Sequence, residues 1–218
     1  MSGGVVRAVA LLSGGLDSAV AAATFARAPG QALAAALFCD YGQRAARRER
    51  DAARRLADRL GAPFVVRDLP WLGELARESG SRLVADGPLP TGTRERPGDA
   101  QSAAAVWVPA RNVVLVTIAA AHAETLGAEV VVTGFNREEA ATFADNSAAF
   151  VAACTAALAL GTRNGVRVES PTLALDKDAI VAAARALGFT AADFWSCYEG
   201  GERPCGRCES CLRSRWQR

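Results

Sequence analysis

Short aliphatic runs alternate with helical patterns along most of the chain, and this alternation restricts the possible folds more than any other feature. The runs predict strands at residues 5–12, 32–38, 63–67 and 129–133. The helical patterns predict helices at residues 17–28, 44–60, 111–126, 148–160 and 177–187. Strands followed by helices, in repetition, indicate an α/β fold with a mainly parallel sheet. Residues 85–103 are rich in Gly, Pro and charge and predict a long surface loop, either a lid or a disordered stretch.

The composition favours one large domain with at most a small appendage. Of the 218 residues, 50% are hydrophobic, which supports a substantial core. The formal net charge of +2 gives no overall field that favours nucleic acid or an anionic membrane. Polar or charged residues interrupt every apolar run before the roughly 18 residues that a membrane span needs, and no signal peptide is recognisable. We therefore expect a cytoplasmic protein with neither a membrane nor nucleic acid as partner.

A glycine-rich loop, Ser13-Gly14-Gly15-Leu16-Asp17-Ser18, separates the first predicted strand from the first predicted helix. Helix N-terminal N–H groups, a closely approaching backbone and two hydroxyl donors suit a phosphate group. Asp17 either caps the helix or helps to hold Mg²⁺. The Walker A lysine and the dinucleotide-binding spacing are both absent, so this is another kind of phosphate loop. A glycine-rich turn with a helix cap and no ligand is the alternative.

Four cysteines lie within 15 residues near the C-terminus: Cys197, Cys205, Cys208 and Cys211. In an intracellular chain this spacing predicts a tetrahedral Zn²⁺ site rather than disulfides, with a redox pair as the alternative. Four protein sulfurs leave no open position, so the metal is expected to be structural. We accordingly expect a main domain at residues 1–190, which carries the phosphate loop and binds the substrate, and a zinc-binding segment at residues 191–218, packed on it.

Two further features predict structure rather than chemistry. The lone His122 lies in an apolar helical stretch and is expected in the core, which excludes Ser-His-Asp and Cys-His mechanisms. Arg44, Arg48, Arg55 and Arg59 share one face of a predicted helix, with acidic residues between them. That face is interpreted as solvated, with an RNA-binding patch as the alternative.

Five motifs occur in a fixed order along the chain. They are Leu12-Ser13-Gly14-Gly15-Leu16-Asp17-Ser18, Asp40-Tyr41-Gly42-Gln43-Arg44, Val108-Pro109-Ala110-Arg111-Asn112, Gly134-Phe135-Asn136, and Ser196-Cys197-Tyr198 with the three following cysteines. Together they resemble the QueC family of 7-cyano-7-deazaguanine synthases, which belongs to the PP-loop ATP pyrophosphatases. The resemblance extends from residue 9 to residue 213.

This resemblance implies a Rossmann-like, doubly wound parallel sheet of about five strands, with the zinc knuckle near the active site. It implies ATP-dependent conversion of 7-carboxy-7-deazaguanine and ammonia to 7-cyano-7-deazaguanine in queuosine and 7-deazapurine biosynthesis. The chemistry would pass through an acyl adenylate and an amide, with release of AMP and pyrophosphate. The expected cofactors are ATP with Mg²⁺ and structural Zn²⁺. The expected partners are these small molecules and, as in many family members, a second copy of the chain.

The resemblance also assigns site residues. ATP is expected to bind to Leu12, Ser13, Gly14, Gly15, Leu16, Asp17 and Ser18. The expected catalytic residues are Asp17, Arg111, Asp145 and Lys177, the last stabilising pyrophosphate. The expected substrate contacts are Asp40, Tyr41, Gln43, Arg111, Asn112, Asn136, Glu139 and Phe143. Several of these follow strands, where open α/β sheets bind ligands. Arg111 suits a bidentate carboxylate clamp, with a helix-capping pair as the alternative.

Two stretches depart from the family pattern. Many bacterial members have Tyr-Pro-Asp-Cys where this chain has Phe143-Ala144-Asp145-Asn146, and a His where it has Ala45. The alternative function is a diverged ligase that forms the same adenylate but stops at the amide, or transfers the acyl group to another amine such as a protein N-terminus. Another adenylating enzyme of this loop class and a zinc-stabilised RNA-binding module are further alternatives.

Overall fold

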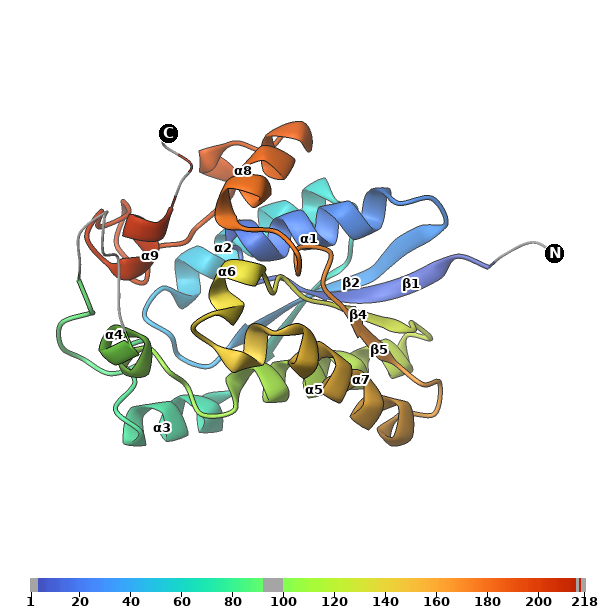
Figure 1. The fold of residues 1–218 in the computed structure, drawn as a ribbon, viewed down its shortest axis with the longest axis horizontal. Helices are drawn as coiled ribbons and strands as arrows, with labels where there is room; N and C mark the ends of the chain where they lie inside the picture. The colour runs from blue at the N-terminus through green and yellow to red at the C-terminus, as the bar shows by residue number, and fades with distance from the viewer. Residues whose placement is uncertain (1–3, 92–99, 215, 217–218) are drawn as a thin grey trace.

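A five-stranded parallel sheet forms the centre of the protein, which the computed structural model describes for residues 4–91, 100–214 and 216. The strands are β1 (Val6–Leu11), β2 (Gln31–Asp40), β3 (Phe64–Asp68), β4 (Val130–Val132) and β5 (Arg167–Glu169). Their order is β3-β2-β1-β4-β5, and each neighbouring pair is parallel (Figure 1). Strands β2 and β3 extend the sheet on one side of β1, and β4 and β5 extend it on the other. The carboxyl ends of β1 and β4 therefore flank the point at which such sheets bind ligands.

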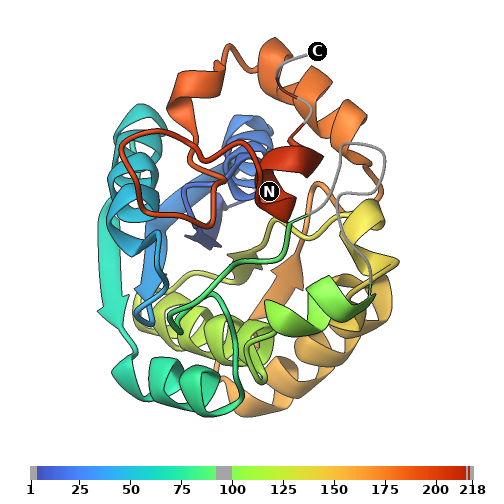
Figure 2. The same cartoon turned by 90° about the vertical axis from the view of Figure 1, so that its left-hand side faces the viewer.

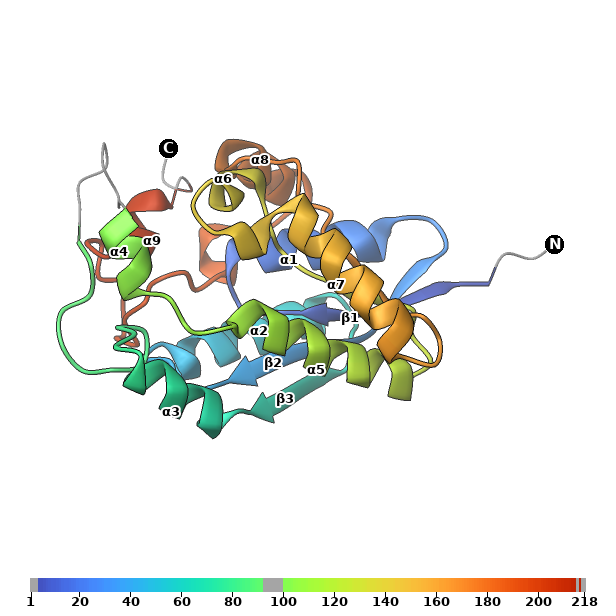
Figure 3. The same cartoon turned by 60° about the horizontal axis from the view of Figure 1, so that its bottom comes forward.

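Helices cover both faces of the sheet. One face carries α1 (Leu16–Arg27), α2 (Ala46–Arg59) and α8 (Lys177–Ala186). The other carries α3 (Pro70–Glu78), α5 (Arg111–Thr125) and α7 (Ala148–Gly161) (Figure 3). Successive strand residues point to opposite faces, so Val9 of β1 belongs to one core while Ala8 and Ala10 belong to the other. Burial on both faces explains why the strands are continuous aliphatic runs.

Shorter helices lie beyond the carboxyl ends of the strands or connect the longer ones. They are α4 (Ala100–Ala105), α6 (Arg137–Ala140), α9 (Glu209–Arg213), and the 3₁₀ helices η1 (Ala144–Asn146) and η2 (Ala191–Asp193). Helices α4 and α9 both lie at the end of the molecule to which β1 points (Figures 1 and 2). Thr91 forms an isolated antiparallel bridge with Cys208. The segment before α4 and the C-terminal segment thus meet above this edge of the sheet.

The predicted α/β fold with a parallel sheet is confirmed, and each predicted strand and helix is present with shifted bounds. The sequence patterns missed β5 and α3. The predicted loop at residues 85–103 was wrong at its C-terminal end because Ala100 begins α4; residues 92–99 lie outside the described part. His122 is partly exposed, because the buried face of α5 is formed by residues such as Val116 and Ala123. None of the described helices is long and apolar enough to span a bilayer.

Candidate active site

The glycine-rich loop connects β1 directly to the N-terminus of α1. Gly14 adopts φ +82°, and a Cβ atom at this position would lie 2.3 Å from the carbonyl oxygen of Glu49 in α2. Only glycine therefore permits this approach and this backbone conformation. The Ser13 and Ser18 hydroxyl oxygens lie 3.1 Å apart, and both residues line a cavity. The loop thus presents hydroxyl groups and a helix N-terminus to one space, as an anion site requires.

Three charged side chains form a partly buried cluster beside this loop. The Nζ atom of Lys177 donates to Asp17 Oδ2 at 2.5 Å and to Glu139 Oε1 at 2.6 Å. Burial raises the pKa of Asp17 to about 6, against the opposing effect of the Lys177 ammonium. The other carboxylate oxygen of Asp17, Oδ1, is buried and has no hydrogen-bond partner among the described residues. Asp17 therefore offers an unused oxygen ligand at the start of α1.

A cavity of about 340 Å³ opens at the carboxyl edge of the sheet. Thirteen of the predicted site residues line it: Leu12, Ser13, Gly15, Leu16, Asp17, Ser18, Tyr41, Gln43, Arg111, Asn112, Glu139, Phe143 and Asp145. The other four do not, namely Gly14, Asp40, Asn136 and Lys177. Asp40 instead accepts a hydrogen bond from the Gly42 backbone N–H at 2.9 Å. The fully buried Asn136 caps α6 by accepting from the Glu139 backbone N–H at 2.9 Å. These two side chains therefore organise the backbone around the cavity.

Arg111 is the first residue of α5, and it brings a positive charge to the wall of the cavity. Burial lowers the pKa of Arg111, but the neighbouring Tyr41, Tyr198 and Asp145 raise it more, so the guanidinium stays charged. Asn112 does not cap the helix together with Arg111: its Nδ2 atom donates to the Asp145 backbone carbonyl at 3.2 Å. The N-cap is Ala110, which adopts the left-handed conformation with φ +52°. The Arg111 side chain lines the cavity beside Tyr41, with which it forms a hydrogen bond, and its remaining donors suit an anionic ligand.

Glu49 is a site residue that the sequence analysis placed among solvated charges. It lines the cavity from α2, and its Oε2 accepts from Gln43 Nε2 at 2.9 Å. Gln43 in turn accepts from the Tyr41 backbone N–H at 3.0 Å. Burial raises the pKa of Glu49 to about 7, with Gln43 and Arg111 opposing this effect. The cavity therefore contains a carboxyl group that titrates near neutral pH.

The C-terminal segment forms another wall of the cavity, and arginines of α2 and of the residues just before it hold the segment in place. Arg44 pairs with Glu199 at 3.1 Å, Arg48 donates to the Gly201 carbonyl at 2.9 Å, and Arg59 pairs with Asp193 at 3.3 Å. The backbone N–H of Trp195 also donates to the Gly14 carbonyl at 2.9 Å, which connects the segment to the glycine-rich loop. The interpretation of this arginine face as simply solvated was therefore wrong, although Arg55 is exposed.

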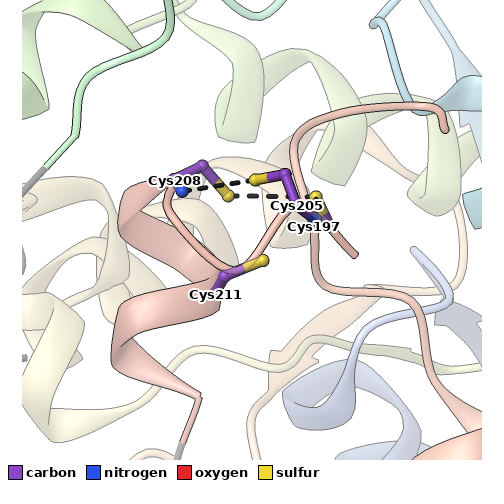
Figure 4. A group of neighbouring side chains, drawn as sticks. All are labelled: Cys197, Cys205, Cys208 and Cys211. Carbon is purple, nitrogen blue, oxygen red and sulfur yellow. Dashed lines mark hydrogen bonds between the residues drawn. The ribbon is translucent and has the colours of Figure 1, made fainter. Parts of the chain in front are cut away.

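The four C-terminal cysteines converge around one point. Their sulfur atoms all lie within 4.8 Å of one another, and the Cys197 and Cys208 sulfurs are 4.0 Å apart (Figure 4). Four thiolates bound to one ion at about 2.3 Å would be separated by similar distances. The Cys205 and Glu199 backbone N–H groups each donate to Cys197 Sγ at 3.3 Å, as suits a thiolate. This donor set fits a single metal ion held by sulfur alone.

The same cysteine loop brings further unpredicted residues to the cavity wall, including Glu209, Ser210 and Arg213. Glu209 follows Cys208 directly, so the cysteine spacing placed it near the metal site. The spacing did not show that its side chain faces the cavity. Glu49 lies one helical turn after Ala45, which also lines the cavity, and this spacing places both on one helix face. This spacing can be recognised in the sequence, but the neighbouring arginines favoured the interpretation of the helix face as solvated.

Comparisons with known proteins agree with this architecture. The family model described as queuosine biosynthesis protein QueC matches residues 7–216. A 7-cyano-7-deazaguanine synthase from Pelotomaculum thermopropionicum is 46% identical over 213 residues, covering 95% of this chain and 94% of the relative. Another from Methanothermobacter thermautotrophicus is 42% identical over 212 residues, covering 96% and 93%.

A solved structure shares the fold at much lower sequence similarity. It is the U34-tRNA thiolase NcsA from Methanococcus maripaludis with its [4Fe-4S] cluster, which matches with a TM-score of 0.53 and 15% identity. The match covers 85% of this chain but 57% of the thiolase. The family match and the near-complete coverage of the curated relatives show that the chain belongs to the QueC family.

Proposed function

We propose that the protein converts 7-carboxy-7-deazaguanine and ammonia to 7-cyano-7-deazaguanine with consumption of ATP. The observation that carries the proposal is that one cavity joins a phosphate-type loop at the start of α1 to the partly buried cation of Arg111. Such a cavity can hold a nucleoside triphosphate and a carboxylate side by side. Membership of the QueC family, whose relatives carry this name, supports the choice of substrate.

The residues divide into two groups under this proposal. The loop from Leu12 to Ser18 binds the phosphates, and Lys177 stabilises the released pyrophosphate from its place beside Asp17. Arg111 binds the substrate carboxylate, while Tyr41, Gln43 and Asn112 shape its surroundings. Phe143 stacks on the deazaguanine ring, and Asp145 and Glu139 contact its polar atoms. Asp40 and Asn136 contribute by holding the backbone of the site.

A carboxylate is a poor acyl donor, so the reaction begins with its activation. A carboxylate oxygen attacks the α-phosphorus of ATP, and pyrophosphate leaves to give the acyl adenylate. Ammonia then displaces AMP and loses a proton, which gives the amide. In a second round the amide oxygen attacks the α-phosphorus of another ATP, pyrophosphate leaves, and the amide nitrogen loses one proton. Loss of AMP and of the second N–H proton then yields the nitrile. The protein contributes positioning and charge neutralisation throughout.

Metal ions would have two separate roles. Mg²⁺, bound with ATP, neutralises phosphate charge, and the unpartnered Oδ1 of Asp17 is a suitable ligand for it. We assign the cysteine cluster to structural Zn²⁺, because four thiolates around one ion are as compact as these sulfurs, whereas a cubane cluster would spread them further. Residues 1–190 then form the catalytic domain and residues 191–218 the metal-binding segment. We expect a homodimer in the cytoplasm, with small molecules as the other partners.

The test is mass spectrometry of the products after incubation with ATP, Mg²⁺, ammonium and 7-carboxy-7-deazaguanine. The wild type is expected to give AMP, pyrophosphate and the nitrile. Asp17→Asn should lower AMP formation strongly, because it removes the charge that pairs with Lys177. Asp51→Asn, on the exposed side of α2, is the matched control and should retain the activity. No AMP from the wild type would refute adenylation of this substrate.

One observation favours a second candidate, the diverged ligase. Phe143 belongs to the stretch that departs from the family pattern, and its ring stacks on Trp107 with centroids 6.2 Å apart and planes 13° apart. In the same stretch Asn146 donates to Asp145 Oδ1 at 3.2 Å. This wall of the cavity therefore differs from that of family members with the usual pattern, and under the second candidate it is where the acyl group would meet its amine. The same experiment separates the candidates: AMP with only the amide, or with an adduct on protein, would favour the ligase.

A further inference from the structure

Glu209 is the most buried acidic side chain in the wall of the cavity, and only one of its oxygens is paired. The residue is 2% exposed and lies at the start of α9, between Cys208 and Cys211. Its Oε1 atom accepts from Arg213 Nη2 at 2.5 Å. Its Oε2 atom is buried and has no hydrogen-bond partner among the described residues. Both Glu209 and Arg213 line the cavity.

A half-paired buried carboxylate is costly unless a ligand completes it. A buried acceptor without a partner loses its hydration and gains nothing in return, whereas a bond between a charged acceptor and a donor is among the stronger hydrogen bonds. Arg213 fixes the orientation of the carboxylate, so the free oxygen points in a defined direction. The group that fits it is a donor N–H carried by the bound ligand.

The position of Arg111 indicates which edge of the substrate carries the N–H donor that Glu209 would accept from. Tyr198 lies near both Glu209 and Arg111, whose charges act on its phenol in opposite directions. Under the proposed function, Arg111 binds the carboxylate on the five-membered ring. The remaining polar edge of the deazaguanine carries two adjacent donors, the ring N1–H and the 2-amino group. A single carboxylate oxygen at Glu209 suits this edge and not a carbonyl.

We propose that Glu209 is a specificity-determining residue whose free Oε2 accepts a hydrogen bond from the N1–H and 2-amino edge of the substrate. This inference rests on the proposed function and adds the element that selects a guanine-type ring. It also gives the cysteine cluster a second role besides stabilising the segment. Because Cys208 and Cys211 flank Glu209, the metal that binds them also positions the residue that reads the base.

The test compares three substrates: 7-carboxy-7-deazaguanine, its analogue without the 2-amino group, and its N1-methyl analogue. AMP release gives kcat/KM for each with the wild type, Glu209→Gln and Glu202→Gln. The wild type is expected to disfavour at least one analogue by about 10-fold to 100-fold, the range for a charge-assisted hydrogen bond. Glu209→Gln should lower kcat/KM for the parent by a similar factor and reduce the discrimination, because the amide replaces one of the two accepting oxygens with an NH2 donor, which then meets the donors of either Arg213 or the base.

Controls separate recognition from structure. Glu202 is exposed on the same segment, so Glu202→Gln should behave as the wild type. The KM for ATP, the zinc content and the melting temperature of Glu209→Gln should stay close to wild-type values. If this variant loses zinc, the wild-type protein alone still allows refutation, because an absence of discrimination would overturn the inference. Equal kcat/KM for all three substrates with the wild type overturns the inference alone, as does full discrimination by a zinc-loaded Glu209→Gln. Absence of AMP with the parent substrate overturns the proposed function and this inference with it.

Discussion

The protonation of Glu49 should make the stability of the protein depend on pH in a direction that is unusual for a carboxyl group. Burial raises its pKa from 4.5 in the unfolded chain to about 7 in the folded protein. Between these values the folded state holds a proton that the unfolded state has lost. The free energy of unfolding must therefore fall as the pH rises through this window. The contribution is fully present below pH 4.5 and is lost above about pH 7.

The magnitude follows from the difference between the two pKa values. A tenfold difference in proton affinity is worth about 1.4 kcal/mol, so the full effect is at most about 3 kcal/mol. Water entering the cavity would reduce it. Three groups face the carboxyl: Gln43, which donates to it, and the charges of Arg111 and Asp40, which oppose each other. Asp17 also titrates in this window, so only a difference between variants isolates Glu49.

The assay is urea unfolding of the wild type and Glu49→Gln at several pH values from 4.5 to 8, with zinc present throughout. The amide imitates the protonated acid and cannot ionise, so the stability of the wild type relative to Glu49→Gln should fall by up to about 3 kcal/mol over this range. Glu78→Gln, an exposed site at the end of α3, controls for removal of one negative charge. A constant difference between the wild type and Glu49→Gln would refute the reasoning.

Three other substitutions test the local geometry. Ala110→Gly should raise the free energy of unfolding by about 1 kcal/mol and the melting temperature by about 2–4 °C, because Ala110 adopts φ +52°; equal or lower stability would contradict the strain. Gly134→Ala would place a Cβ 2.5 Å from the Ser18 backbone nitrogen, so it should raise the KM for ATP and cost about 1–3 kcal/mol; an unchanged KM would count against this contact. Cys208→Ser should lower zinc content and melting temperature together, as measured by metal analysis and calorimetry; full zinc with unchanged stability would argue against the metal site.

Most of the fold could be predicted because its signals are local. The strands β1, β2 and β4 are buried on both faces and therefore stand out as aliphatic runs between helical patterns. β5 was missed because it spans only Arg167–Glu169, and its two charged ends hide the single buried Val168. α4 was missed because a short alanine-rich segment follows a loop-forming stretch, and only packing against neighbours decides its structure.

The candidate site was less predictable, because long-range pairing decides what each side chain does. The family resemblance assigned Asp17 and Lys177 to the site, but only the fold shows that Lys177 forms partly buried ion pairs with both Asp17 and Glu139. Asn136 follows a strand and stays a predicted substrate contact, but only the fold shows that its Oδ1 caps α6 while its buried Nδ2 has no hydrogen-bond partner among the described residues. A carboxylate or amide at a strand end can face the ligand or the backbone, and the sequence pattern does not distinguish these directions.

The C-terminal segment explains how a metal that takes no part in the chemistry can still affect it. This segment adds no strand to the sheet, but its Trp195 backbone donates to Gly14 of the phosphate-type loop, and Glu209 lines the cavity. Without a metal, four close thiols would lose the interaction that holds their loop in place. The loop would then release Glu209 before it disturbed the sheet. Removal of zinc by a chelator should therefore raise the KM for the deazaguanine more than the KM for ATP, and equal increases would contradict this coupling.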